Sequence, residues 1–458
     1  MRLARSLPGM PAAAPVRIVH LGVGNFYRAH AAWYTHHAPD ASDWGIAAFT
    51  GRRPDAAQAL APQDGLYSLI TKAAEGDEIE VIASIVAVHR SDEHQRYLDY
   101  LSDPAIAILT LTVTEAGYRR GQDGHIDLSD EQVAADIAAL RVDPRAPVQT
   151  VPGKLVAGLL ARRAAGAGPI SVLSCDNLPN NGAATEAVVL SMARAIDDSA
   201  ADWAADQVDF ATPMVDRITP ATTDADRDAV AEHLDALDAA PVPTEPFSEW
   251  VISGTFPAGR PAWQDAGVQL VTDVEPHERR KLWLLNGSHS QLAYVGSILG
   301  HQTIDAAIAD QRCLGWVRQW WEEAASHLNL PTEQIAAYTQ ALLRRYANPR
   351  VRHLTAQIAA DGSQKIPVRT VPVVVAERAA GRIPIGGATT LAGWILHLRG
   401  HGAPIKDQTV ERALAAAATE PLVSAVDQVL QLLGLGQDPE LAAAVTGQAE
   451  LLLAGSSA

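Results

Sequence analysis

The chain has 458 residues and a formal net charge of −17. That length exceeds what one ordinary hydrophobic core organises, so two domains are expected. The negative charge argues against nucleic acids and anionic membrane surfaces as partners, because polyanions repel an acidic protein.

The cysteine content and the amino terminus indicate a soluble cytoplasmic protein. Cys175 and Cys313 are the only cysteines, so neither a disulfide framework nor a cysteine zinc site is expected. Residues 1–15 lack the apolar run of a secretion signal, and no apolar stretch reaches the roughly 18 residues of a membrane helix. We expect a monomer or a small homo-oligomer that acts on a small molecule.

Strand-like and helix-like segments alternate through the first half of the chain, which predicts a parallel, doubly wound, Rossmann-like sheet. Apolar runs typical of buried strands occur at residues 17–22, 44–50, 105–113 and 169–174. Residues 64–90 look instead like an antiparallel pair with a turn at Glu75, Gly76 and Asp77. Near residue 275 this alternation ends, and the segments that follow have a helical period with little strand character. We therefore expect a dinucleotide-binding domain over residues 1–274 and a mostly α-helical substrate and catalytic domain over residues 275–458.

A glycine motif follows the first expected strand. Gly22 and Gly24 would let the backbone turn tightly and approach a pyrophosphate, which N–H groups at the start of the next helix then bind. Tyr27 stands where a third glycine is usual, so the fingerprint is partial and an ordinary strand-to-helix turn is the alternative. The candidate cofactor-binding residues here are Gly22, Gly24, Asn25 and Phe26.

The second expected strand ends without the acidic residue that usually accepts the ribose hydroxyls of NAD. Arg52 and Arg53 stand there, and the first carboxylate is Asp55. Two guanidinium groups favour the 2′-phosphate of NADP through charge-assisted hydrogen bonds, whereas an arginine pair on a solvated loop is the alternative. The sequence predicts NAD or NADP as cofactor, with a preference for NADP.

Residues 278–294 read as a helix that carries polar groups among apolar ones. At about 100° per residue, Glu278, Lys281, Asn286 and His289 fall in one arc of roughly 140° that two leucines share. An apolar neighbourhood shifts pKa values, and a desolvated lysine can serve as an acid or base. The alternatives are a lysine that extends to solvent and a histidine that satisfies a core hydrogen bond.

The K-x-x-x-x-N-x-x-H pattern of Lys281, Asn286 and His289 resembles the signature of the mannitol dehydrogenase family, the polyol-specific long-chain dehydrogenases and reductases. The likeness covers nearly the whole chain. Further family-like landmarks appear in the expected order: HLGVGNFYRAH, LTVTEAGY, SCDNLPNNG, MVDRITP, EPF, GRPAW and DGSQKIP.

The resemblance implies a role for each residue of the polar helix. Lys281 would be the general acid and base, and Asn286 with Asn177 would form the oxyanion hole. His289 would orient the substrate, and Glu278 would pass the proton of the lysine to solvent. For Asn177 the alternative is a turn cap.

The resemblance also implies where the substrate binds. Asp216 and Lys365 match positions that contact substrate hydroxyls, although Asp216 and Arg217 alternatively form a surface ion pair. Polyol enzymes of the family tend to carry arginine where this chain has Gln357. Residues 357–369 look more like the sugar-acid branch, in which Lys365 and Arg369 would face a carboxylate.

The expected activity is the interconversion of a secondary alcohol with its ketone, preferably mannonate with fructuronate. Mannitol or arabinitol oxidation is the alternative, and a non-catalytic nucleotide sensor is a more remote one. A 3-hydroxyacid dehydrogenase fits the spacing and the other landmarks less well. No metal is expected, because the sequence lacks H-E-x-x-H and C-x-x-C motifs.

Overall fold

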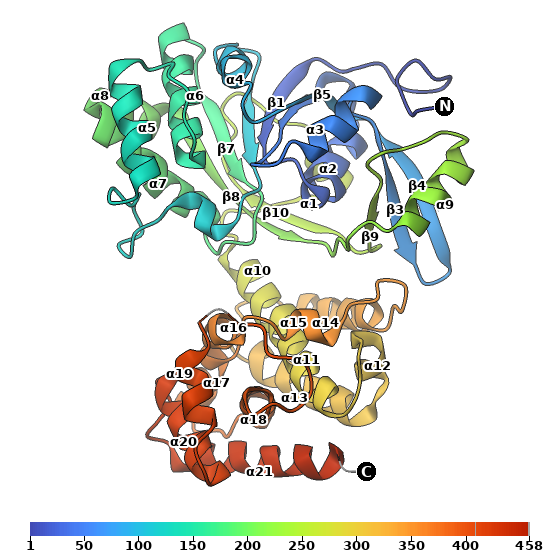
Figure 1. Ribbon diagram of the computed structural model, residues 1–458, viewed down its shortest axis with the longest axis vertical. Coiled ribbons are helices and arrows are strands. Elements are labelled where there is room, and N and C mark those ends of the chain that lie inside the picture. The colour runs from blue at the N-terminus through green and yellow to red at the C-terminus, as the bar shows by residue number, and fades with distance from the viewer. Residues whose placement is uncertain (408, 457–458) are drawn as a thin grey trace. The chain divides into compact units, whose positions relative to one another are not determined.

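The computed structural model describes residues 1–407 and 409–456, which form two compact units, Met1–Val274 and Glu275–Ala458. In the described residues all β-strands belong to the first unit, whereas the second unit is helical. This confirms the predicted fold class. Figure 1 colours the first unit blue to yellow-green and the second yellow to red. No helix among the described residues combines the length and apolar character needed to cross a membrane.

An eight-stranded sheet forms the centre of the first unit, in the order β11-β10-β8-β7-β6-β1-β2-β5. The six strands from β8 to β5 pair in parallel, whereas β10 is antiparallel to β8. The parallel sheet expected from the sequence is therefore present in six strands, and the sheet departs from it at the β10 edge. The chain re-enters the sheet at the end where β8 finished, with Glu249 opposite Asp216. The strands are β1 (Val16–Leu21), β2 (Gly45–Phe49), β5 (Ile85–His89), β6 (Ile108–Leu111), β7 (Ile170–Ser174), β8 (Val208–Asp216), β10 (Glu249–Ser253) and β11 (Gln269–Leu270).

Alternate residues of the central strands point to opposite faces of this sheet. Val19 and Leu109 belong to a buried cluster to which α4–α8 contribute, whereas Ile18 and Ile108 belong to a second cluster built with α1–α3. Helices therefore cover both faces, as Figure 1 shows, and the sheet is doubly wound. The helices are α1 (Asn25–Ala29), α2 (Ala31–His37), α3 (Asp55–Leu60), α4 (His94–Leu101), α5 (Glu131–Val142), α6 (Val151–Ala165), α7 (Asn181–Ile196), α8 (Asp198–Gln207) and α9 (Asp224–Leu234), with short 3-10 turns η1 (Ala41–Asp43), η2 (Ala61–Gln63), η3 (Glu115–Tyr118) and η4 (Trp263–Ala266).

A second, three-stranded sheet in the same unit has the order β4-β3-β9. β3 (Tyr67–Ala73) and β4 (Gly76–Ile82) are antiparallel, as the sequence predicts for this region. β9 (Val242–Thr244) adds to β3 in parallel. The turn lies one residue earlier than expected, because Gly76 already pairs with Ala73.

The second unit is built around one buried helix. In α18 (Ile385–Leu398) every residue after the first is buried, and the helix packs against α11, α13 and α21. A helix that is apolar on all sides needs neighbours on all sides. The surrounding elements are α10 (Glu275–Arg280), η5 (Lys281–Gly287), α11 (Ser288–Ile298), α12 (Ile304–Ala309), α13 (Gln311–Ala325), α14 (Thr332–Tyr346), α15 (Thr355–Ile358), α16 (Gly362–Arg369), α17 (Val371–Ala379), α19 (Glu411–Ala417), α20 (Leu422–Leu432) and α21 (Pro439–Ser456).

Candidate active site

The loop between β1 and α1 carries the glycine motif. Gly22 has a φ of +99°, and a Cβ atom built there would lie 2.2 Å from the carbonyl oxygen of Thr112. Only glycine adopts this positive φ readily and has no Cβ atom that would collide with the carbonyl oxygen. At Gly24 a Cβ atom would meet only the oxygen of Gly22, at 3.8 Å. A loop whose main chain is this open lets a pyrophosphate approach its N–H groups, so the loop fits a dinucleotide.

The residue in place of the third glycine fills the core. In the usual fingerprint that glycine brings helix and strand close together. Tyr27 is 1% exposed, and its ring stacks on His20 of β1 with the centroids 3.3 Å apart. Burial lowers the pKa of His20 to about 3, so the stacked imidazole is neutral. An aromatic pair thus replaces the close helix–strand contact.

The other two candidates of the motif, Asn25 and Phe26, begin α1. Asn25 donates to the hydroxyl of Thr222 at 3.3 Å and accepts from Nη2 of Arg28 at 2.7 Å. The ring of Phe26 stacks on His30 at 5.6 Å. These contacts fix the start of α1, so the two side chains hold the loop in place from within the first unit.

Arg52 and Arg53 lie in an exposed loop after β2. The Nε atom of Arg53 is 3.7 Å from Oδ2 of Asp55, and these side chains are 88% and 70% exposed. Such an ion pair contributes little to stability and does not fix the arginine. Both guanidinium groups are therefore accessible at the end of the second strand.

Asn177 lies exposed in the loop after β7. Its neighbour Asp176 accepts a hydrogen bond from the N–H of Leu178 at 3.2 Å, and Asn180 is the N-cap residue of α7. The side chain of Asp176 therefore takes part in closing the turn that precedes α7.

Asp216 ends β8 and is 2% exposed. Its neighbour Arg217 is also buried and donates to the carbonyl oxygens of Ala29 at 2.6 Å and Glu245 at 3.3 Å. The alternative of a surface ion pair between Asp216 and Arg217 is therefore wrong, because neither side chain is at the surface.

The polar stretch of the second unit is one helical span but not one α-helix. α10 passes into the π-helix η5, which then continues as α11. A π-helix bonds residue i to residue i+5, so Lys281 and Asn286 lie on the same side of the helix. In an α-helix they would be about 140° apart. His289 follows Asn286 by three residues on α11 and Glu278 precedes Lys281 by three on α10, both α-helical neighbours. The predicted helix is confirmed, but the regular α-helical spacing is wrong.

His289 is buried within this span, and its ring lies against Tyr346 and His353, with centroids 4.7 and 5.1 Å away. Burial is the main cause that holds its pKa well below the ordinary value of 6.5. His353 and the guanidinium groups of Arg345 and Arg369 add to the lowering. A neutral imidazole both donates and accepts a hydrogen bond, which suits a residue that orients a hydroxyl or carbonyl group.

The remaining candidates of this unit lie on α15 and α16. Arg369 ends α16 and donates from Nη1 to the carbonyl oxygen of Asn286 at 3.3 Å and to the hydroxyl of Ser290 at 3.1 Å. Lys365 donates from Nζ to the carbonyl oxygen of Ile358 at 3.1 Å, and burial lowers its pKa. Gln357 on α15 is exposed. Arg369 is thus tied directly to the helical span that carries Lys281, Asn286 and His289.

Two family models match the chain. The mannitol dehydrogenase Rossmann domain matches residues 16–265, and the mannitol dehydrogenase C-terminal domain matches residues 273–453. The chain belongs to the mannitol dehydrogenase family. The resemblance stated from the sequence motifs is confirmed, and this family member is an oxidoreductase with a Rossmann-type nucleotide-binding part.

Relatives of this family member carry several names. The D-mannonate oxidoreductase of Escherichia coli (strain K12) is 38% identical over 395 residues, which are 84% of this chain and 80% of that protein. A D-sorbitol dehydrogenase in substrate-free form has a TM-score of 0.90 and 29% identity, and the match covers 100% of this chain and 99% of that one. The Pseudomonas fluorescens mannitol 2-dehydrogenase, in a ternary complex with NAD and D-mannitol, has a TM-score of 0.79 and 33% identity, with 97% and 93% covered.

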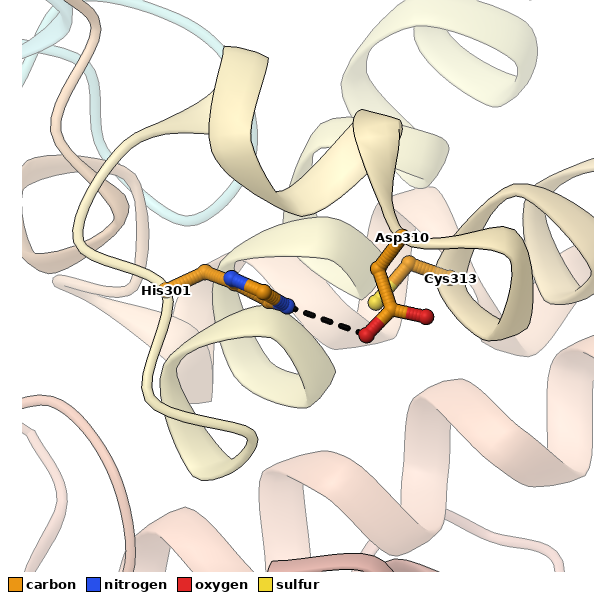
Figure 2. A group of neighbouring side chains, drawn as sticks. All are labelled: His301, Asp310 and Cys313. Atoms are coloured by element: carbon orange, nitrogen blue, oxygen red, sulfur yellow. Dashed lines mark hydrogen bonds and ion pairs between the residues drawn. The ribbon is translucent and has the colours of Figure 1, made fainter.

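One cluster in this family member has side chains of metal-binding type. Figure 2 shows His301, Asp310 and Cys313, whose nearest ligand atoms lie within 4.8 Å of one another. Asp310 accepts from Nε2 of His301 at 3.1 Å, pairs with the guanidinium group of Arg312 at 2.7 Å and caps α13. Burial raises the pKa of Cys313 to about 12, whereas a metal would need the thiolate. These contacts explain the cluster as a helix cap.

Sequence reasoning missed Tyr346 and His353, the two residues that flank the ring of His289. They lie 57 and 64 residues after it in the chain, and no motif joins them to it. A helical period predicts which face of a helix is buried, but it does not predict which other segment lies on that face.

Proposed function

We propose that this family member is an NAD(P)-dependent, metal-independent oxidoreductase that interconverts the secondary alcohol of an open-chain sugar acid with the matching ketouronate, preferably mannonate with fructuronate. The observation that carries this proposal is Arg369. Its guanidinium group is partly buried, and no carboxylate in the described part of the chain lies within 4.0 Å of it. Burying a cation is costly unless an anion accompanies it. The carboxylate of a sugar acid is such an anion, and a polyol has none.

Lys365 supports the same substrate class. Its pKa is lowered by burial and then by the positive charge of Arg369, so the two cations lie close together. An arginine presents a fork of donors to a carboxylate, and a neighbouring ammonium group adds charge. The carboxylates of Asp361 and Asp407 partly offset this lowering at Lys365, whereas Gln357 carries no charge. The 38% identity to a D-mannonate oxidoreductase is further support.

The helical span supplies the proton chemistry of the proposal. In ketone reduction the ammonium group of Lys281 gives its proton to the oxygen that becomes the alcohol, and in oxidation the neutral amine takes that proton back. Asn286 donates to the same oxygen while it carries negative charge, and His289 orients the substrate. Glu278, one turn before the lysine, exchanges the proton with solvent.

Other residues complete the proposal from the first unit. We assign Asn177 as a second oxyanion donor and Asp216 as a partner for substrate hydroxyls, both on the family resemblance. Gly22, Gly24, Asn25 and Phe26 build the loop that fits the pyrophosphate of NAD or NADP, with Arg52 and Arg53 at the ribose end. The bound nicotinamide accepts or supplies the hydride.

The second candidate function is oxidation of mannitol or arabinitol. It is favoured by the TM-score of 0.90 to a D-sorbitol dehydrogenase and by the likeness to a mannitol 2-dehydrogenase. A non-catalytic nucleotide sensor is the third candidate, but a sensor has no use for a lysine aligned with an oxyanion donor.

The experiment is a specificity panel. Nicotinamide absorbance is followed with D-mannonate, D-mannitol and D-arabinitol in oxidation and with D-fructuronate and D-fructose in reduction, using NAD(H) and NADP(H). We expect kcat/KM for the sugar-acid pair to exceed that of every polyol at least about tenfold, since one charge-assisted hydrogen bond contributes roughly 1.5–3 kcal/mol. A higher value for a polyol would establish the second candidate. Reduced-cofactor binding without turnover of any substrate would establish the sensor.

A further inference from the structure

The π-helix η5 receives side-chain hydrogen bonds at four consecutive carbonyl groups. All four donors come from other helices of the second unit, namely two from α13, one from the end of α14 and one from the end of α16. The pairs are Trp320 Nε1 to Trp283 O at 2.7 Å, Trp321 Nε1 to Leu284 O at 2.9 Å, Tyr346 Oη to Leu285 O at 3.1 Å and Arg369 Nη1 to Asn286 O at 3.3 Å.

Side-chain donors at this place supply what the end of a π-helix lacks. Where i→i+5 bonding returns to i→i+4 bonding, the two patterns do not mesh and one carbonyl group loses its main-chain donor. A buried carbonyl group without a donor costs free energy, so the segment would otherwise favour the α-helical form. Donors aligned along this junction stabilise the π-helical form instead.

One glycine admits the closest of these donors. A Cβ atom built at Gly287 would lie 2.7 Å from Cζ2 and 2.8 Å from Nε1 of Trp320. Only glycine therefore lets that indole ring approach the helical span closely enough to reach the oxygen of Trp283. The sequence at the end of the π-helix is thus adapted to the donor that stabilises it.

The π-helical form decides where two reactive side chains lie. Lys281 and Asn286 begin and nearly end η5, and i→i+5 bonding places them on one side of the helix. Return to α-helical bonding would separate them by about 140° around the axis. An acid and base that no longer shares a side with the oxyanion donor cannot serve the same oxygen atom.

We propose that Trp320, Trp321 and Tyr346 are positioning residues, which hold η5 in the π-helical form and thereby align Lys281 with Asn286. This inference rests on the proposed function of those two residues. None of the three positioning residues needs to touch the substrate, since each acts through a main-chain carbonyl group.

The test compares Trp321→Phe and Tyr346→Phe with Trp316→Phe in the full-length enzyme. Trp316 lies on the same helix α13, is partly exposed and offers a matched loss of an indole group. Trp321→Phe and Tyr346→Phe should lower kcat on the order of tenfold or more, with KM and the Kd of the cofactor nearly unchanged. Trp316→Phe should keep the wild-type kcat. Tyr346→Phe removes only one hydroxyl group, so it serves if Trp321→Phe does not fold.

A double-mutant cycle separates positioning from general stability. In a Lys281→Ala background, Trp321→Phe should cause little further loss of kcat, because there is no lysine left to align. The same fold-loss in both backgrounds would overturn the positioning role and leave the proposed function intact. Wild-type turnover in Lys281→Ala alone would remove the lysine from the proposed function, and the positioning role with it.

Discussion

Arg369 and Asn286 are joined by a hydrogen bond of 3.3 Å from a guanidinium nitrogen to a main-chain oxygen. The same nitrogen donates to the hydroxyl of Ser290 at 3.1 Å. The residue proposed to bind the substrate carboxylate is therefore also bonded to the π-helix that carries the oxyanion donor. The proposed binding of the substrate carboxylate would thus act on the geometry of the π-helix through this one side chain.

The first prediction concerns the charge of that side chain. Arg369→Gln should lower kcat/KM for the sugar acid about 10- to 100-fold, the range for one charge-assisted hydrogen bond, and should lower kcat/KM for a polyol less. The measurement is the ratio of the two specificity constants. Arg344→Gln, at an exposed arginine on α14, is the matched control and should leave the ratio unchanged. Equal losses for both substrates would show that Arg369 has no part in recognising the carboxylate.

The second prediction concerns the lysine as acid and base. Lys281→Ala should lower turnover by at least the roughly 10² that general acid–base catalysis contributes, with the Kd of the cofactor unchanged. In the wild type the oxidation rate should rise with pH as the ammonium group loses its proton, and the variant should lose this limb. Lys406→Ala, at an exposed lysine of the same unit, should keep the wild-type profile. A variant that retained the pH limb would assign it to another group.

The strands of the sheet were predictable because their pattern is local. Runs such as residues 44–50 and 169–174 are mostly apolar and contain no charged residue, and they form β2 and β7 with every strand residue buried. A strand buried on both faces has no polar alternation, and that signal is present in the sequence itself. The antiparallel direction of β10 was not predictable in this way, because strand direction depends on where a distant connection re-enters the sheet.

The π-helix was not predictable from the residues that form it. Lys281, Asn286 and the leucines between them fit an α-helical pattern equally well. The two helical forms differ only in whether the main-chain hydrogen bonds join residues four or five apart. Trp320 and Trp321, which donate to carbonyl groups of the π-helix, lie on α13, where the sequence shows only an amphipathic helix. Motifs in the sequence thus name the candidate side chains of the site, whereas the alignment of these side chains depends on tertiary contacts.

The third prediction concerns stability against pH. Glu323 accepts from the N–H groups of Gly386 at 2.7 Å and Gly387 at 2.9 Å at the start of α18. Burial, and then the like charges of Glu377 and Glu322, raises the pKa of Glu323 from 4.5 to about 7. The folded chain therefore holds this proton more tightly than the unfolded chain. The stabilisation that comes from binding this proton is fully present below about pH 4.5 and is lost as the pH rises through 7.

Glu323→Gln removes this titration. Between about pH 5 and pH 8, the unfolding free energy of the wild type should fall by up to roughly 3 kcal/mol relative to that of the variant. Urea unfolding at the two pH values measures it. Glu333→Gln, at an exposed glutamate at the start of α14, is the control and should show no such change. A difference that is the same at both pH values would show that Glu323 is ionised in the folded chain throughout this range.

The last prediction concerns the cofactor. Arg52 and Arg53 stand after β2 in place of a carboxylate that would repel a 2′-phosphate, and both are exposed. The single ion pair of Arg53 with Asp55, at 3.7 Å, is too weak to hold its guanidinium group away from a phosphate. We therefore expect kcat/KM for NADPH to exceed that for NADH about tenfold or more, since one charge-assisted hydrogen bond suffices for that ratio.

The variants Arg52→Ala and Arg53→Ala should each lower this ratio chiefly through the KM of NADPH, because the phosphate contact is the same in the ground state and the transition state. Raising the salt concentration should lower the ratio in the wild type and have less effect in the double variant, because exposed charges are screened. Arg90→Ala, at an exposed arginine that follows β5, serves as the control. A wild type that prefers NADH, with a ratio that neither variant alters, would show that these arginines face solvent and that the preference is set by the rest of the loop.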